Sequence, residues 1–285
     1  MRQTGVTVID NLKTSNHDEE YWKQFKNIYR FIHADVTEMD HKELVRLIQK
    51  HQRVYHFAGS VGVEYIDKDP SGTLANNLAL NNKLIPIFKD ARRHVVFSST
   101  SEIYGNGPFG EDDNASIGPS SKLRWGYAAS KLMMEFQLRA ENIDHTTVRF
   151  FNVVGPGQLG DYGMVLPRFI KAAKNNDDLI VYGNGMQVRS FCHVKDAVDA
   201  LIRVSDINGE IFNIGNDQPI TIGALAERVI ELSGSSSKIV YVPYEQAFSK
   251  NHGDIVKRVP DLTKIKAITG YVPQYGLDDI IKDML

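Results

Sequence analysis

Val6-Thr-Val-Ile-Asp-Asn11 is the stretch from which the fold of this chain can be worked out. Four β-branched or apolar residues precede an aspartate and an asparagine, which is the pattern of a short buried strand that ends in a turn. The pattern returns at Tyr29–Ile32 and at Val54–Ala58, with polar stretches of helical spacing between. Strands that alternate with helices indicate a parallel sheet with helices on both faces.

The alternation continues through the first half of the chain. Pro70 suits a first helical turn and opens a long helical pattern. Further on, the sequence predicts a strand at Val95–Ser98, a helix at Tyr127–Ala140 and a strand at Thr146–Val154. After about residue 152 glycine and proline become denser and the predicted strands are shorter (Leu179–Tyr182, Val188–Phe191, Ile211–Ile214, Ile239–Val242). We therefore predict a doubly wound α/β fold, with an incomplete dinucleotide-binding domain at 1–152. Residues 153–285 form a smaller α/β substrate domain with excursions back to the first.

Composition excludes several classes of protein. The 285 residues include 33 basic and 35 acidic ones, so no basic field favours nucleic acid or an anionic membrane. No apolar run approaches the roughly 18 residues of a spanning helix, and the first residues do not resemble a signal peptide. A single cysteine excludes an internal disulfide and favours a reducing compartment. We expect a cytoplasmic enzyme without a bound metal.

The chain has one match to the glycine pattern of dinucleotide-binding loops, Gly155-Pro-Gly157-Gln-Leu-Gly160. We interpret it as a decoy, because the helical pattern does not begin at its last glycine, where a pyrophosphate would need a helix N-terminus. Asp10 is the better ribose-binding acid, since it ends an apolar strand and suits an unphosphorylated ribose diol. A turn cap is the alternative role for this carboxylate.

Asp10 also indicates what the chain lacks. The phosphate-binding loop should precede the ribose acid by about 20 residues, which is before Met1. We therefore expect the first strand, the glycine-rich turn and the first helix to be absent, with open edges on the strands at Val6–Ile9 and Val54–Ala58.

Two motifs supply a candidate reaction centre. Tyr127 and Lys131 are four residues apart, so on a helix they share a face. A tyrosine needs its pKa lowered by about 3 units, roughly 4 kcal/mol, to act as a base at neutral pH, and an adjacent cation favours this. Ser98-Ser-Thr100-Ser-Glu102 ends a strand, at the edge where doubly wound sheets bind ligands. There a hydroxyl such as that of Thr100 can share a proton with Tyr127.

With these motifs in place, the chain resembles the NAD-dependent sugar-nucleotide epimerase/dehydratase family of extended short-chain dehydrogenases/reductases over nearly its whole length. The matching segments follow the family's order: VIDN (8–11), ADV (34–36), HFAGSVGV (56–63), DP (69–70), SSTSEIYG (98–105), RWGYAASK (124–131), RFFNVVGPGQ (149–158), YGNGMQVRSFCHVKDAV (182–198), FNIGN (212–216) and KRVPD (257–261).

The resemblance implies a role for each matching residue. For NAD it implies Asp10 and Asn11 at the adenosine ribose, Asp35 and Val36 at the adenine, Phe57, Ala58, Gly59 and Ser98 along the dinucleotide, and Lys131 at the nicotinamide ribose. For catalysis it implies Tyr127 and Thr100 at the sugar 4-hydroxyl, with Lys131 and Glu102. For a nucleotide sugar, UDP-linked in our reading, it implies Val61, Asn152 at the phosphates, and Arg189 and Arg258 at the diphosphate or uridine. A planar guanidinium suits phosphate oxygens, although a surface ion pair is the alternative role for an arginine. A homodimer is also expected.

Which family member this is remains open in the sequence. Ser101 stands where thymidine-linked dehydratases carry an acid, which disfavours 4,6-dehydration. The Thr100-Ser-Glu102 triplet and Arg124-Trp125 resemble UDP-glucuronate decarboxylases, in which Arg258 could hold the carboxylate. We rank UDP-sugar 4-epimerase slightly ahead of decarboxylase.

The expected gap at the front leaves three interpretations. The natural protein is longer and active, with this chain starting at an internal methionine. Alternatively, this chain binds sugar nucleotides without catalysis. In the third interpretation, another chain fills the open edge in an obligate oligomer.

Overall fold

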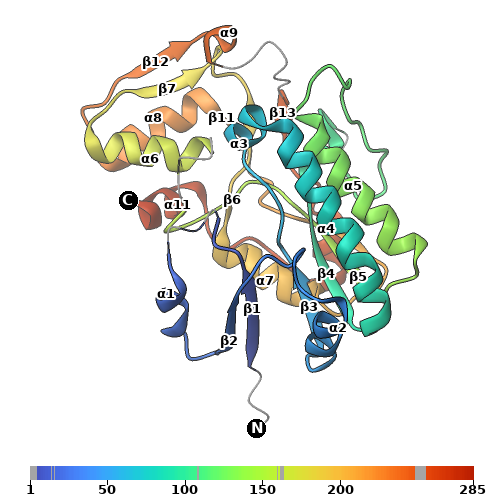
Figure 1. Ribbon diagram of the computed structural model, residues 1–285. Coiled ribbons are helices and arrows are strands. Elements are labelled where there is room, and N and C mark those ends of the chain that lie inside the picture. The colour runs from blue at the N-terminus through green and yellow to red at the C-terminus, as the bar shows by residue number, and fades with distance from the viewer. Residues whose placement is uncertain are drawn as a thin grey trace.

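A four-stranded parallel sheet runs through the centre of the molecule (Figure 1). The computed structural model describes residues 5–13, 15, 17–107, 109–158, 160, 164–247 and 255–285. The strand order is β10-β5-β4-β3, with bounds β3 (Arg53–His56), β4 (His94–Thr100), β5 (His145–Phe150) and β10 (Ile211–Ile214). All three ladders are parallel. This confirms the predicted doubly wound α/β fold.

A second, two-stranded parallel sheet holds the sequence motif that opens the chain. It pairs β1 (Val6–Asp10) with β2 (Ile28–His33). In a doubly wound sheet the strand that the sequence analysis expects to be absent would lie between β1 and β3, and no ladder joins β1 to β3 in the described part of the chain. The sheet is thus divided at this position. β3 ends at His56, two residues before the predicted end at Ala58.

Helices cover both faces of the four-stranded sheet. Side chains alternate along each strand, so each strand presents apolar residues to both faces. Val95 and Phe97 point into a core formed with α2 (His41–Gln49), α4 (Pro70–Ala91) and α5 (Trp125–Ala140). Val96 points into the opposite core, formed with α7 (Val194–Val204) and α10 (Thr263–Thr269). α4 and α5 lie side by side in Figure 1. Pro70 occupies the first turn of α4, as predicted.

The second half of the chain forms a smaller α/β layer, at the upper left in Figure 1. β7 (Leu179–Tyr182) and β12 (Ile239–Val242) pair in parallel, and α6 (Val165–Asn175), α8 (Ile222–Ser233) and α11 (Leu277–Met284) share its core. The Thr221 hydroxyl accepts the Ala224 N–H and caps α8, as the sequence indicates. The chain also returns to the first half, where β10 pairs with β5. The boundary at residue 152 stays a prediction.

The predicted strand at Thr146–Val154 is wrong in one respect, because it is broken after β5. Asn152 has a φ of 37°, a left-handed conformation that an asparagine tolerates but a strand does not. The chain resumes as β6 (Val153–Val154), which pairs with β9 (Cys192–His193). Cys192 is buried there, and burial raises the pKa of its thiol to about 12.

Shorter elements complete the chain: α1 (Glu19–Lys23), α3 (Val63–Lys68), the 3-10 helix η1 (Ser101–Tyr104), β8 (Val188–Arg189), β11 (Ile220–Thr221), α9 (Tyr244–Ala247) and β13 (Lys257–Arg258). β8 is shorter than predicted and lies between β11 and β13. None of the described helices is long and apolar enough to cross a membrane.

The glycine pattern at 155–160 does not run directly into α6. α6 begins only at Val165, after Leu159 and residues 161–163, which lie outside the described residues. A Cβ atom at Gly155 would meet the Val194 side chain at 2.5 Å, so this glycine allows close packing against the start of α7. The start of α6 at Val165 agrees with the expectation that the long helical pattern does not begin at Gly160.

Candidate active site

The carboxyl end of β4 and the helix α5 bring the predicted catalytic residues together. Thr100 ends β4, and its hydroxyl accepts the Glu102 N–H at 3.2 Å, which caps η1. Tyr127 lies in the first turn of α5 and is 7% exposed. The Thr100 hydroxyl lies close enough to the Tyr127 hydroxyl to lower its pKa.

The environment of Tyr127 favours its neutral form. Burial raises the pKa of the Tyr127 hydroxyl, and the Glu102 carboxylate raises it further. The nearby Thr100 hydroxyl and the charge on Arg258 lower this pKa, but they do not outweigh burial. The sequence analysis expects the Lys131 charge to lower the pKa of Tyr127, but Lys131 is not among the groups that affect this pKa.

Lys131 instead faces the strand one turn further along α5. Its ammonium donates to the Ser98 carbonyl at 3.0 Å and lies 5.1 Å from the centre of the Phe97 ring. Burial lowers the pKa of Lys131 to about 8. Burial and the Lys131 charge together lower the pKa of His56, at the end of β3, to about 3. The end of β3 and α5 therefore meet around one buried cation.

A second buried cluster, formed by Glu102, Arg124 and Arg258, adjoins Tyr127. Glu102 Oε1 accepts from Arg124 Nη2 at 3.0 Å and from Arg258 Nη1 at 3.1 Å. Burial on its own raises the pKa of Glu102, but the two guanidinium groups outweigh it, and the pKa lies below its usual range. Within the described ranges, Glu102 Oε2 and Arg258 Nε are buried without a hydrogen-bond partner. Two cations thus surround one carboxylate, and polar atoms are left for a ligand.

Asn152 and Arg189 lie beside this cluster. The Asn152 side chain donates to the Ser190 carbonyl at 2.8 Å, and its oxygen accepts from Arg258 Nη2. Arg189 and Arg258 are register partners on β8 and β13. Arg189 donates to the carbonyl of Val188. Arg258, predicted at the diphosphate, therefore contacts the catalytic cluster, with Arg189 on the adjacent strand.

The predicted adenosine-binding residues form a separate group at the ends of β1 and β2. Asp10 Oδ1 accepts the Leu12 N–H at 2.7 Å, so this carboxylate does cap a turn. Asn11 donates to Asp35 Oδ2 at 2.9 Å. Hydrogen bonds from Thr37 and Asn11 lower the pKa of Asp35 to about 2, so it is ionised at neutral pH. Val36 packs against the core below α2 and α4.

The loop after β3 lies in the sequence between the predicted adenosine-binding residues and the predicted catalytic residues. Phe57 is 48% exposed and meets the Phe150 ring edge-on at a centroid distance of 6.2 Å. Ala58 and Val61 are exposed as well. Gly59 has a φ of 154°, and a Cβ atom there would lie 3.2 Å from Asn77 Oδ1 and 3.3 Å from Lys131 Nζ. Only a glycine lets the backbone approach Lys131 so closely.

Comparison with known proteins identifies the family. The model of the NAD dependent epimerase/dehydratase family matches residues 2–215. The chain belongs to this family. It is 34% identical over 288 residues to the UDP-N-acetyl-alpha-D-glucosaminuronate decarboxylase of Bacillus cytotoxicus, covering 98% of this chain and 88% of the relative.

More distant relatives carry other activities in their names. Identity to UDP-glucuronic acid decarboxylase 1 of Xenopus tropicalis is 27%, over 96% of this chain and 64% of the relative. Among solved structures, UDP-glucose 4-epimerase of Thermotoga maritima with UDP-glucose aligns with a TM-score of 0.77 at 26% identity, covering 98% of this chain and 88% of that one. The family and the fold are therefore established, and the choice among reactions is not.

The family's cofactor can be tested against the residues present. The close approach of Gly59 to Lys131 leaves room for backbone but not for a side chain. Lys131 has three N–H donors, and only the bond to Ser98 is formed within the described part. Asp10 Oδ2 likewise has no partner there. Unused donors beside a glycine, and an unused carboxylate oxygen at a strand end, fit the ribose groups of a dinucleotide.

Sequence reasoning missed one member of the cluster, Arg124. This arginine is 8% exposed, immediately precedes α5 and binds Glu102. The spacing could have indicated that Arg124 lies near Tyr127, because residues three apart on a helix lie within one turn of each other. Nothing in the local sequence indicates that its partner would be Glu102. In the described ranges no group of three or more His, Cys, Asp or Glu side chains could hold a metal.

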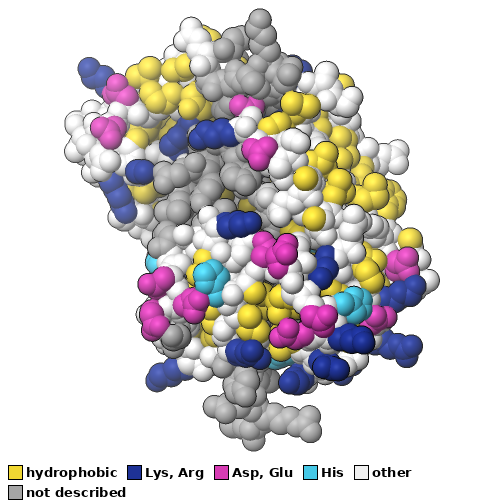
Figure 2. Space-filling view, viewed as in Figure 1, with side chains coloured by type: hydrophobic (Ala, Val, Ile, Leu, Met, Phe, Trp, Pro, Cys, Tyr) yellow, Lys and Arg dark blue, Asp and Glu magenta, His cyan; other side chains and the backbone are white. Residues whose placement is uncertain are grey.

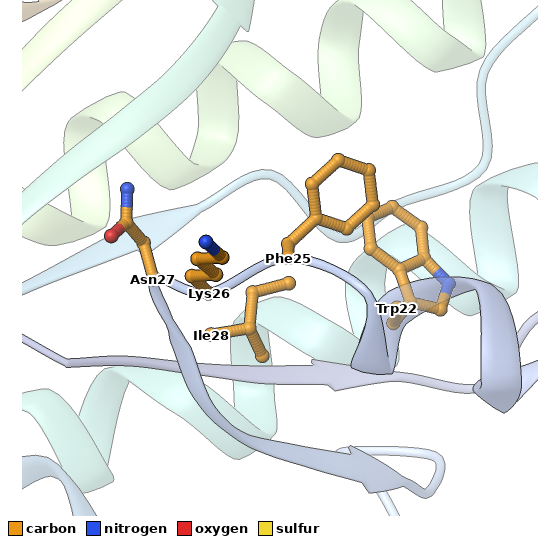
Figure 3. Close-up of a pocket in the computed structure, with 5 residues that line it drawn as sticks. All are labelled: Trp22, Phe25, Lys26, Asn27 and Ile28. Atoms are coloured by element: carbon orange, nitrogen blue, oxygen red, sulfur yellow. The ribbon is translucent and has the colours of Figure 1, made fainter.

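A surface cavity of about 320 Å³ lies elsewhere, where α1 meets β2 (Figure 3). It is lined by Trp22, Phe25, Lys26, Asn27 and Ile28. The Trp22 and Phe25 rings lie 6.1 Å apart. None of the predicted site residues lines this cavity, and we assign no reaction to it.

Proposed function

We propose that this chain decarboxylates a UDP-linked uronic acid through a 4-keto intermediate, with NAD as cofactor. The observation that carries the proposal is the buried Arg258 guanidinium beside Tyr127, whose Nε has no hydrogen-bond partner among the described residues. Its Nη1 shares the Glu102 carboxylate with Arg124. A buried donor without a partner is costly, so an anionic group of the substrate would complete the hydrogen bonds of Arg258. A uronate carboxylate has the right charge and geometry for a guanidinium.

The proposal assigns a task to each residue. Asp10, Asn11, Asp35 and Val36 would hold the adenosine end of NAD, and Lys131 the nicotinamide ribose. When bound, NAD accepts a hydride from carbon 4 of the sugar and can return it. Tyr127 takes the proton of the 4-hydroxyl, and Thr100 holds the Tyr127 hydroxyl in place. Because Tyr127 favours its neutral form in this structure, a nearby positive charge has to lower its pKa before it can act.

Decarboxylation then follows from the 4-keto group. The bond between carbons 5 and 6 breaks, carbon dioxide leaves, and the electron pair moves to the 4-keto oxygen, to which Tyr127 and Thr100 can donate. A proton returns to carbon 5 afterwards. Arg258 holds the carboxylate until the bond breaks, and Glu102 keeps Arg258 in position. Sequence similarity to decarboxylases supports this reading.

A 4-epimerase is the second candidate, and the sequence alone ranked it slightly ahead. The structural likeness to UDP-glucose 4-epimerase favours it. UDP-glucose has no carboxylate to occupy the arginine cluster, which is why we place decarboxylation first. A third candidate, a sugar-nucleotide-binding protein without catalysis, predicts UDP-sugar binding in calorimetry without NAD binding.

The test uses UDP-glucuronate and UDP-N-acetylglucosaminuronate labelled with ¹³C at carbon 6. The purified chain is first denatured and assayed for released nicotinamide cofactor, and is then incubated with NAD and each substrate. Labelled carbon dioxide supports the proposal. A 4-epimer that retains the label supports the epimerase, and absence of turnover together with absence of NAD binding contradicts both.

Arg258→Met is the informative variant in this assay. It should weaken uronate binding much more than UDP-glucose binding, because only the uronate presents a carboxylate. Arg203→Met is the control, since Arg203 forms an exposed ion pair with Asp199 on α7. Equal losses for both sugars would contradict the role proposed for Arg258.

The expected homodimer also belongs to this proposal. α5 exposes Met133 and Phe136 by 49% and 62%, and hydrophobic side chains gather on the right-hand edge of Figure 2, over α4 and α5. An apolar helix face of this kind suits a second copy of the chain. Sedimentation equilibrium should show a dimer that Phe136→Ser dissociates; a monomeric parent chain at micromolar concentration would contradict this.

A further inference from the structure

Three consecutive residues of β4 face α5. The Ser98 carbonyl accepts from Lys131, the Ser99 hydroxyl donates to Glu135, and the Thr100 hydroxyl lies close enough to Tyr127 to affect its pKa. The three α5 positions are four residues apart, so they lie on one face of the helix. Two hydrogen bonds thus join the strand end to the helix, and the Ser99–Glu135 bond is the one that involves no proposed catalytic group.

Glu135 is itself held from a third element. Arg149 on β5 donates from Nη2 to Glu135 Oε2 at 2.7 Å and from Nε to Oε1 at 3.2 Å. Glu135 and Arg149 are 4% and 5% exposed. The third Arg149 nitrogen, Nη1, donates to the Tyr104 hydroxyl at 2.7 Å and to the Glu111 carbonyl at 3.1 Å.

A buried ion pair is a costly way to fill a core. Well-packed apolar residues in its place are often as stable or more stable, so the pair does not follow from stability alone. The ion pair instead fixes an orientation, because a guanidinium bound through two nitrogens holds the carboxylate in one position. That carboxylate then fixes Ser99, the residue between Ser98 and Thr100.

We propose that Ser99 and the Glu135–Arg149 pair are positioning residues, which hold the Tyr127 hydroxyl in register with Thr100. None of the three touches the proposed reacting atoms. The inference rests on the proposed function, because it takes Tyr127 as the group that receives the sugar proton. A displacement of about 1 Å at a reacting group can lower a rate by about a hundredfold.

The principal test is Ser99→Ala, which removes the tether and leaves the ion pair intact. We expect kcat to fall about tenfold, with KM within about twofold of the parent value, because substrate contacts are unchanged. Ser205→Ala is the matched control. Ser205 is also buried, and its hydroxyl donates to the Leu201 carbonyl at the end of α7, away from the site.

A second readout does not depend on turnover. The pKa of Lys131 is measured by NMR of ¹³Cε-labelled lysine, with the signal assigned by its loss in Lys131→Arg. If the tether sets the distance between β4 and α5, Ser99→Ala admits water and raises the Lys131 pKa from about 8 towards 10.5. General destabilisation would not change a pKa measured in the folded state.

Glu135→Gln provides an independent variant with the same expected direction. If both variants act through the Ser99–Glu135 bond, their effects on kcat are not additive in the double variant. The inference is overturned if Ser99→Ala matches Ser205→Ala in kcat and in the Lys131 pKa. If the parent chain turns over no nucleotide sugar but the Lys131 pKa still rises in Ser99→Ala, the proposed function fails and the positioning role stands.

Discussion

Replacing Lys131 by methionine should make the protein more stable at neutral pH. Lys131 is 7% exposed, and burial lowers its pKa from 10.5 to about 8. Burial therefore disfavours its charged form, which predominates at pH 7. Methionine has a similar length and carries no charge, so Lys131→Met removes this cost.

The magnitude follows from the pKa difference. A difference of 10.5 − 8 = 2.5 units, at 1.36 kcal/mol for each unit, gives about 3 kcal/mol. The Ser98 carbonyl loses its donor in the variant, which costs about 1 kcal/mol. The expected gain at pH 7 is therefore about 2 kcal/mol in the free energy of unfolding.

The sign of the pH dependence is fixed by the same values. Between pH 8 and 10.5 the unfolded chain holds a proton on Lys131 that the folded chain has released, so the parent protein gains stability as pH rises through this window. Lys131→Met lacks this gain. The difference between variant and parent should therefore shrink from about 2 kcal/mol at pH 7 to near zero at pH 10.

The assay is urea unfolding followed by circular dichroism at pH 7, 8.5 and 10. Lys42→Met is the control, because Lys42 is an exposed lysine on α2 and its replacement should give no such trend. A variant less stable than the parent at pH 7 would refute the reasoning. So would a difference that does not change with pH.

Three further predictions concern the same region. Tyr127→Phe should abolish turnover but spare sugar-nucleotide binding in calorimetry; unchanged turnover would refute the catalytic assignment. Arg149→Met should cost about 3–5 kcal/mol in urea unfolding by leaving Glu135 buried and unpaired, and adding Glu135→Met should recover most of it. Gly59→Ala should lose about 1–3 kcal/mol and more than Gly157→Ala, because both glycines have a positive φ but only Gly59 would contact its neighbours.

Most of the sheet could be predicted from the sequence, because strands buried on both faces have a strong local pattern. The run at Val95–Ser98 lies within β4, and the Tyr127–Lys131 spacing lies on α5 as expected. The break at Asn152 could not be predicted, since it depends on a backbone conformation that the run of residues from Thr146 to Val154 does not reveal.

Part of the candidate site was also beyond the sequence. Arg258 and Glu102 are 156 residues apart, and no local pattern relates them. The resemblance implies Arg258 at the diphosphate or uridine of a nucleotide sugar, or at a substrate carboxylate. In the structure the strand β13 brings it to Glu102, a contact that the resemblance did not indicate. Likewise, Glu135 follows Lys131 at helical spacing, but its partners Ser99 and Arg149 become visible only when β4 and β5 are adjacent.

The buried thiol of Cys192 can serve as an intrinsic probe of local opening of the fold. It is the one cysteine in the sequence, it is 0% exposed, and its raised pKa keeps it protonated and unreactive. A thiol reagent can therefore react only when the core around Cys192, formed with α7, β10 and Tyr271, opens, so labelling kinetics measure how often this part of the molecule opens. Because β6 directly follows Asn152, slower labelling on addition of a nucleotide sugar would detect binding without any probe being introduced.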